Sequence, residues 1–371
     1  MKLAHAPGLA LLLLCARMRV DDPQSRRILS QIDRGVDWKA LLSLAHRHGL
    51  IPILHRTLSD LPAGTVPSEI LGQLQSMSEA FRIRNLIFLS ELVRLQQAFA
   101  AADVVVMPYK GTALAGFLYR DAGLRQVLDV DLLVRPCDAI KARRVLLDQG
   151  CIPARTLSLR AEAAKVKYHF EFVFVSKGKL SVELQWRIAP GYWRLPEIED
   201  FAWSKMEQLS LGGVGVPWFC RESLLLVLCL HGCKHKWDTL KWLVDVAELL
   251  RLHPALNWPE MMACARRTGA ERMLALGLFL AHELLDAPLP PDVLDSVRKY
   301  PRVLSLAEDV CSNAFAADAE HATVLIELAF LSRVTERWAT KLACHVLRPL
   351  YFIFHRMVRP GAAVLRRALT R

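Results

Sequence analysis

Apolar residues recur every three or four positions through the first hundred residues of the chain, which is the spacing of a buried helix face. Two such segments follow each other between Trp38 and Leu54. A loop rich in proline and glycine, 60–68, leads into one long periodic stretch that closes the region. The pattern predicts an all-helical N-terminal region over residues 1–102.

After residue 102, short runs rich in β-branched residues alternate with helical segments. Strands are expected at 104–107, 127–134, 168–175 and 180–188, and helices at 111–119 and 136–150. Residues 176–179 have the composition of a hairpin turn between the last two strands. The order β-α-β-α-β-β predicts a small mixed sheet over residues 103–215.

A glycine-rich bend at 212–217 leads into helical periodicity that extends over the rest of the chain, 216–371. The expected fold class is therefore α+β, with a small mixed β-sheet core flanked by N-terminal and C-terminal all-helical regions.

Composition narrows the class of protein. Of the 371 residues 53% are hydrophobic, which excludes a mainly disordered chain. No window approaches the ~20 consecutive apolar residues of a membrane-spanning helix. The apolar segment 9–16 runs into Arg17 without a small-residue cleavage site, so we expect an ordinary first helix. Nine scattered cysteines without a CxxC pair are typical of reduced thiols, and together these features predict a cytoplasmic protein.

The net charge of +11 is concentrated at one end of the chain. From Arg333 to Arg371, nine basic residues accompany the single acid Glu336, so +8 of the net charge lies there. This argues against a surface coated by nucleic acid and for one local anionic contact. Residues 337–371 also carry large apolar side chains. They fit either the last helix of the domain or a basic amphipathic segment in weak contact with an anionic membrane or RNA.

Two aspartates, Asp129 and Asp131, lie in the expected strand 127–134. Residues i and i+2 of a strand point to the same face, about 6–7 Å apart, and two like charges at that separation are costly unless a cation neutralises them. Divalent ions such as Mg²⁺ prefer oxygen ligands. Alone, the pair also fits a solvent-facing strand edge, but Glu183 repeats the pattern on a later strand and favours the metal site.

The tripeptide Lys110, Gly111 and Thr112 lies between an expected strand and an expected helix. Glycine lets backbone N–H groups approach a phosphate, and a helix N-terminus favours an anion. The same residues also fit a plain strand-to-helix turn. Arg125, four residues before Asp129, is expected either to clamp a phosphate or to pair with one of the two aspartates.

Four polar residues, His231, Lys234, His235 and Asp238, have the spacing of one helical face. We expect this face either to contact nucleotide phosphate or the second substrate, or to form a buried hydrogen-bonded network with Asp245. A structural zinc site is disfavoured, because the neighbouring cysteines project about 200° away on a helix.

The order of these motifs resembles a known family. Lys110-Gly111, then Asp129-Val130-Asp131, then Glu183-Leu184-Gln185-Trp186 is similar to the bacterial nucleotidyltransferase-fold proteins of the DNA polymerase β-like superfamily. It resembles more narrowly a mostly uncharacterised group in which Lys-Gly replaces the Gly-Ser of the phosphate loop and in which His usually stands at the position of Gln185. Segments 230–237 and 240–245 resemble that group's helical region.

The resemblance implies a Mg²⁺-dependent (or Mn²⁺-dependent) enzyme that transfers NMP from an NTP such as ATP to an unknown acceptor, whether small molecule, protein or RNA. Asp129 and Asp131 would hold the metal, and Glu183 would complete the triad and help to activate the attacking hydroxyl. The residues expected around the nucleotide are Lys110, Gly111, Thr112, Arg125, Lys234 and His235.

Two other classes of function stay open on sequence grounds. One is a catalytically inactive nucleotide-binding or scaffold protein that keeps the fold without turnover. The other is a membrane-surface or RNA-associated protein that acts through residues 337–371.

Overall fold

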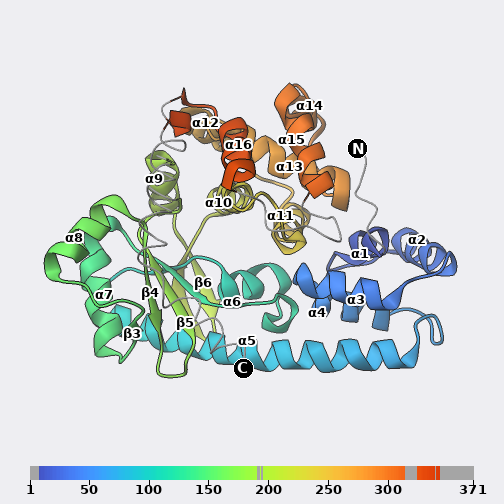
Figure 1. Cartoon of the computed structure of the whole chain (residues 1–371), viewed down its shortest axis with the longest axis horizontal. Coiled ribbons are helices and arrows are strands. Elements are labelled where there is room, and N and C mark those ends of the chain that lie inside the picture. The colour runs from blue at the N-terminus through green and yellow to red at the C-terminus, as the bar shows by residue number, and fades with distance from the viewer. Residues whose placement is uncertain (1–7, 190–192, 194, 314–323, 339, 343–371) are drawn as a thin grey trace. The chain divides into compact units, whose positions relative to one another are not determined.

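The computed structural model describes residues 8–189, 193, 195–313, 324–338 and 340–342 (Figure 1). By internal packing the chain divides into two compact units. Unit 1 contains Met1–Leu86, Ala115–Val127 and Arg221–Glu336, and unit 2 is built on Ile87–Leu114 and Leu128–Cys220. The units therefore interleave along the sequence. Most of the basic tail, 343–371, lies outside the described residues.

Unit 1 is helical, as the 3.6-residue periodicity predicts. Its N-terminal helices are α1 (Leu9–Cys15), α2 (Asp22–Asp33), α3 (Trp38–Arg47), α4 (Ile51–Ser59) and the first half of α5 (Ser68–Ala101). The short turns η1 (Ala115–Tyr119) and η2 (Ala122–Leu124) follow. Its C-terminal helices are α10 (Arg221–Lys234), α11 (Leu240–Leu252), α12 (Trp258–Thr268), α13 (Glu271–Leu285), α14 (Pro291–Arg298), α15 (Pro301–Asn313) and α16 (Val324–Val334).

Helix α10 lies at the centre of the unit 1 core. Every residue from Ser223 to Cys233 is buried, and α10 packs against α11, α12 and α13. A helix that is apolar all round needs neighbours on every side, which explains why this segment shows no amphipathic stripe.

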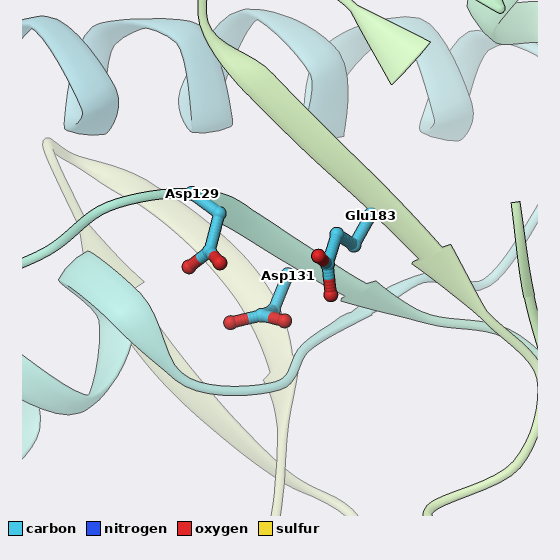
Figure 2. A group of neighbouring side chains, drawn as sticks. All are labelled: Asp129, Asp131 and Glu183. Atoms are coloured by element: carbon cyan, nitrogen blue, oxygen red, sulfur yellow. The ribbon is translucent and has the colours of Figure 1, made fainter. Parts of the chain in front are cut away.

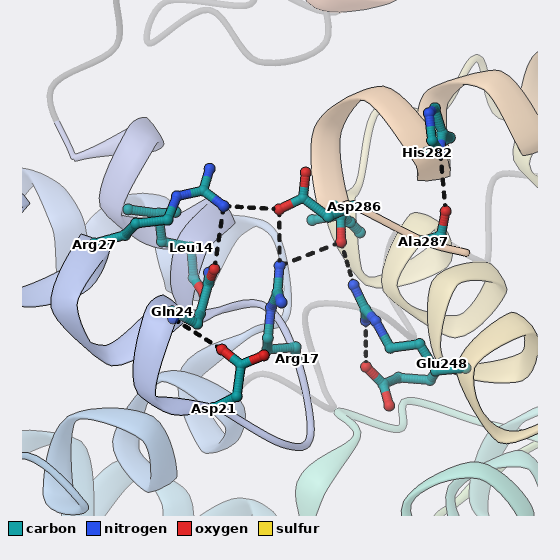
Figure 3. Close-up of polar contacts among 11 residues, drawn as sticks. Leu14, Arg17, Asp21, Gln24, Arg27, Glu248, His282, Asp286 and Ala287 are labelled. Atoms are coloured by element: carbon teal, nitrogen blue, oxygen red, sulfur yellow. Dashed lines mark hydrogen bonds and ion pairs between the residues drawn. The ribbon is translucent and has the colours of Figure 1, made fainter. Parts of the chain in front are cut away.

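Ionic contacts join sequence-distant helices of unit 1 (Figure 3). The carboxylate of Asp286, at the end of α13, accepts from Arg17 at 3.3 Å and from Arg27 at 3.0 Å. Nearby, Arg251 pairs with Glu248 and donates to the backbone carbonyl of Leu285. These contacts join α2 and the segment after α1 to the end of α13, and α11 to the end of α13.

Unit 2 contains a five-stranded sheet in the order β1-β2-β5-β4-β3. The strands are β1 (Met107–Pro108), β2 (Val130–Leu133), β3 (Ile152–Pro153), β4 (Glu171–Val175) and β5 (Ser181–Gln185). β2 and β5 are parallel, and the other neighbours are antiparallel, so the sheet is mixed. The accompanying helices are α6 (Gly111–Leu114), η3 (Pro136–Asp138), α7 (Ala139–Asp148), α8 (Leu159–Tyr168) and α9 (Pro196–Ser204).

The two faces of this sheet differ in character. Phe172 and Phe174 of β4, with Val182 and Leu184 of β5, are buried on one face, and α7 packs against β5. The opposite face carries the acidic residues of β2 and β5, because side chains alternate along a strand. The predicted α+β class and the predicted hairpin between β4 and β5 are confirmed.

Three local predictions were wrong. The glycine-rich bend at 212–217 is a β-hairpin of β6 (Glu207–Leu211) and β7 (Val214–Trp218), because two glycines with positive φ make its tight turn. The first strand begins at Met107 rather than at 104. Tyr168 ends α8, a helix that Ser158 caps at its start by accepting from the Ala161 N–H, and the strand begins only at Glu171.

None of the helices in the part of the chain that the structure describes combines the length and the apolar character needed to cross a membrane.

Candidate active site

Three carboxylates meet on one face of the unit 2 sheet, at the neighbouring strands β2 and β5 (Figure 2). Asp131 lies on β2, Asp129 directly precedes that strand, and Glu183 lies on β5. The parallel register places Asp131 opposite Glu183. One carboxylate oxygen of each residue lies within 4.8 Å of the others. The structure thus brings together the acids that the sequence pattern singled out; below we call them the acidic triad.

The side chains of Lys110 and Gln185 contact the acidic triad. The ammonium of Lys110 lies 3.3 Å from Oδ1 of Asp131. The amide nitrogen of Gln185 donates to Oδ1 of Asp131 and to Oε2 of Glu183, at 3.2 Å in each case. Gln185 is the last residue of β5, two positions after Glu183, so its side chain points to the same face.

Burial and the neighbouring charges shift the pKa values of Glu183 and Lys110. Burial raises the pKa of Glu183 well above its usual range, and the negative charges of Glu171, Asp129 and Asp131 raise it further. Burial alone would lower the pKa of Lys110, but the neighbouring carboxylates, Asp131 first, raise it above its ordinary value, so this side chain stays protonated.

The donor set fits a divalent cation. It offers three hard oxygen ligands from adjacent strands, and carboxylates this close repel one another. Mg²⁺ and Mn²⁺ bind carboxylate oxygens and would relieve that repulsion. Within the described part of the chain no other group of three acids, histidines or cysteines comes close enough to share one ion.

The predicted phosphate turn lies beside the acidic triad in unit 2. β1 pairs with β2, and the Tyr109 N–H donates to the backbone carbonyl of Asp131 at 3.0 Å. Gly111 has φ of 58°, a left-handed conformation that glycine adopts without strain. Thr112 is buried directly after it.

Arg125 belongs to unit 1, where its guanidinium is buried and paired with Asp245. Nε lies 3.0 and 3.1 Å from the two carboxylate oxygens, and the Nη2 group lies 2.9 Å from Oδ2. The Tyr119 hydroxyl donates to Oδ1 of the same carboxylate at 2.7 Å. The sequence analysis expected Arg125 to clamp a phosphate or to pair with Asp129 or Asp131. The structure pairs it with Asp245, the residue that the sequence analysis had linked to the histidine face.

The histidine face also differs from the prediction. Helix α10 ends at Lys234, and Lys236 and Trp237 both have φ of 57°, so Asp238 does not continue the helical spacing. The ring of His231 lies 4.7 Å from that of His235. Both rings also contact Trp242, at 4.9 Å.

The sequence analysis did not assign a role to Gln185 or to Glu171. Strand alternation offered a signal for both, since Gln185 is two residues after Glu183, and the β4–β5 hairpin places Glu171 opposite Gln185. The signal was weak, because a neutral amide on a strand has no characteristic chemistry.

Comparison with known proteins supports the resemblance. The sequence profile of a family described as "Uncharacterised nucleotidyltransferase" matches residues 34–286, more than half of the chain, and the matched range includes the acidic triad and the 110–112 turn. Neither the curated proteins nor the solved structures include a significant match. The chain belongs to this uncharacterised nucleotidyltransferase family.

Proposed function

We propose that this protein is a metal-dependent nucleotidyltransferase that transfers an NMP group from an NTP to an acceptor hydroxyl. The observation that carries the proposal is the acidic triad, whose oxygens lie within 4.8 Å of one another. Such a cluster is costly to bury without a cation, and its register across the parallel pair β2–β5 fixes it in place.

Asp129 and Asp131 would hold the divalent ion, Mg²⁺ or Mn²⁺, with Glu183 beside them. Bound there, the ion would neutralise charge on the reacting phosphates and lower the pKa of the acceptor hydroxyl. The acceptor oxygen forms a bond to the α-phosphorus while the bond to pyrophosphate breaks. Glu183, whose pKa is already raised, would accept the hydroxyl proton at Oε1, since Oε2 receives the Gln185 amide.

The turn from Lys110 to Thr112 would face the nucleotide phosphates. It directly follows β1, the strand paired with β2, so its backbone begins next to the acids. In this proposal Gly111 keeps the backbone open to a phosphate and Thr112 supplies a hydroxyl. The buried pair that Arg125 forms with Asp245 favours a structural role for Arg125.

Nucleotide binding tests the proposal directly. The full chain is offered labelled ATP, GTP, CTP and UTP with Mn²⁺, and binding is compared between the native chain and an Asp129→Asn, Asp131→Asn variant. We expect the variant to lose at least tenfold in affinity. Asp148→Asn is the matched control, because it removes an exposed carboxylate of the same unit from the end of α7. Native chain without metal-dependent NTP binding would overturn the proposal.

Turnover is then measured as pyrophosphate release with small-molecule, protein and RNA acceptors. The same proposal places the protein in the cytoplasm, where NTPs are abundant. The eight cysteines in the described segments form no disulfide with one another, in keeping with that compartment.

A further inference from the structure

The side-chain amide of Gln185 joins two members of the acidic triad. Its nitrogen lies 3.2 Å from Oδ1 of Asp131 and 3.2 Å from Oε2 of Glu183. An amide NH₂ group has two hydrogens, so it can donate to both carboxyl groups at once. Asp131 lies on β2 and Glu183 on β5, and one neutral side chain therefore connects the acids of two neighbouring strands.

The orientation of this amide follows from the groups that it meets. If the amide were turned over, its oxygen would face two other oxygens, so the nitrogen is assigned to the side of the acids. The contact with Glu183 does not require that residue to be ionised, because a carboxyl oxygen accepts a hydrogen bond in either protonation state. The two hydrogen bonds thus hold whether or not Glu183 carries a proton.

The backbone of Gln185 is fixed from both sides. It pairs with Leu133 of β2 and with Glu171 of β4. Its carbonyl also accepts from the Val134 N–H at 2.8 Å. The residue is only 2% exposed. A buried side chain on a strand that is paired on both sides has few alternative rotamers, so the amide donates from a fixed position.

The acids need such a donor because their own side chains turn easily. The last torsion of an aspartate or a glutamate is broad, and a carboxylate without a hydrogen bond samples many orientations. Mg²⁺, in contrast, demands near-ideal geometry from its oxygen ligands. A hydrogen bond from outside the coordination shell supplies that geometry, and its loss typically lowers metal affinity by about 10–100-fold.

We propose that Gln185 is a positioning residue of the acidic triad. Its amide holds the carboxyl groups of Asp131 and Glu183 in the arrangement that receives the divalent ion, while the amide nitrogen itself is not a metal ligand. The inference rests on the proposed function, because it concerns how the same three acids bind metal.

Manganese affinity tests this inference without any turnover. The full chain is titrated with Mn²⁺, and free and bound ions are measured by electron paramagnetic resonance. Gln185→Met keeps the length of the side chain but removes the donor, and we expect its Mn²⁺ affinity to fall by about tenfold or more. The spectrum of the bound ion should also broaden, because acids that turn freely coordinate it in several arrangements. Native affinity in a folded Gln185→Met chain would overturn the inference.

A matched control separates positioning from packing. Gln96 is a buried glutamine of the same unit, on α5. Gln96→Met makes the same chemical change away from the acidic triad, so we expect native Mn²⁺ affinity. A loss in this control equal to that in Gln185→Met would show that the affinity responds to packing in unit 2, and the inference would be overturned.

A second variant at the same position keeps the inference testable if Gln185→Met does not fold. Gln185→Asn preserves the amide but shortens the side chain by one methylene group, so the nitrogen no longer reaches both acids. We expect a several-fold loss of Mn²⁺ affinity, and native affinity would again overturn the positioning role while leaving the proposed function intact. A native chain that binds no Mn²⁺ would overturn both.

Discussion

Two nearly unexposed aspartates, one in each unit, have opposite electrostatic surroundings. Asp245 of unit 1 is fully matched by Arg125, which contacts both of its oxygens, and by the Tyr119 hydroxyl. Asp131 of unit 2 receives Lys110 and Gln185 but also lies within 4.8 Å of two more acids. The first aspartate is paired with a guanidinium, whereas the second lies among other carboxylates as well as next to two donors.

The comparison distinguishes a buried aspartate that stabilises the fold from one whose surroundings suit a ligand. A buried ion pair costs desolvation of both partners and is retained when its geometry recovers that cost. Nothing in the fold of unit 2 requires three acids on this face of the sheet, since an apolar side chain would pair as well on β2 or β5. Three carboxylates this close together are therefore the natural candidate for a site that binds a ligand of opposite charge.

Breaking the Arg125–Asp245 pair has the largest expected effect on stability. Asp245→Ala leaves the Arg125 guanidinium buried without its carboxylate, and we expect a loss of about 3–5 kcal/mol in the free energy of unfolding. Urea denaturation of the full chain measures it. The double variant Arg125→Met, Asp245→Leu serves as the control, since it removes both charges and should recover most of the loss. Equal losses in the two variants would show that packing, not charge, dominates there.

Glu199 on α9 has the second-largest expected effect on stability, through its titration. Glu199 accepts one hydrogen bond, from the Ile188 N–H at 3.1 Å. Burial raises its pKa to about 7, although this hydrogen bond and the charge of Arg187 oppose the rise.

Between the ordinary pKa of 4.5 and about 7, the folded chain keeps a proton on Glu199 that the unfolded chain has lost. The free energy of unfolding should therefore fall as the pH rises through this window, by about 2 kcal/mol for a partly exposed group. Glu199→Gln, which keeps the acceptor for Ile188, should flatten that slope. Denaturation curves at pH 4.5, 6 and 7.5 measure it, and an unchanged slope in the variant would assign the pH dependence to other groups.

Reducing the repulsion within the acidic triad has the smallest expected effect on stability, and the opposite sign. In metal-free buffer, Glu183→Gln removes one of the three repelling acids and should raise the free energy of unfolding by about 1 kcal/mol. Mn²⁺ should stabilise the native chain but not this variant. Thermal denaturation with and without Mn²⁺ measures both effects. A metal-free variant less stable than the native chain would argue that Glu183 is structural.

Much of the fold was predictable because its signals are local. The long helix α5 and the β4–β5 hairpin follow from periodicity and turn composition. The alternation that put Asp129 and Asp131 on one face also holds in the structure. The hairpin at 212–217 was missed because β6 is mostly polar and exposed, so it lacks the alternation by which a strand is recognised.

The partners of the charged residues were harder to predict from the sequence. Arg125 and Asp245 are separated by 120 positions, and nothing local to either residue specifies the other. The same holds for Lys110 and Gln185, which reach Asp131 from either side of β2 only because β1 and β5 flank that strand. Sheet order is a long-range property, and a single sequence records only the residue types that it brings together.

The interleaving of the two units has a consequence for biosynthesis. The last segment of unit 1 begins at Arg221. The acidic triad, in contrast, is complete once Glu183 has emerged from the ribosome. The core of unit 1 cannot form completely until after the sheet has been translated, because its N-terminal helices pack with helices that are translated later. Early termination of translation would release a chain with a complete acidic triad and an incomplete apolar core in unit 1, the kind of product that chaperones retain and proteases remove.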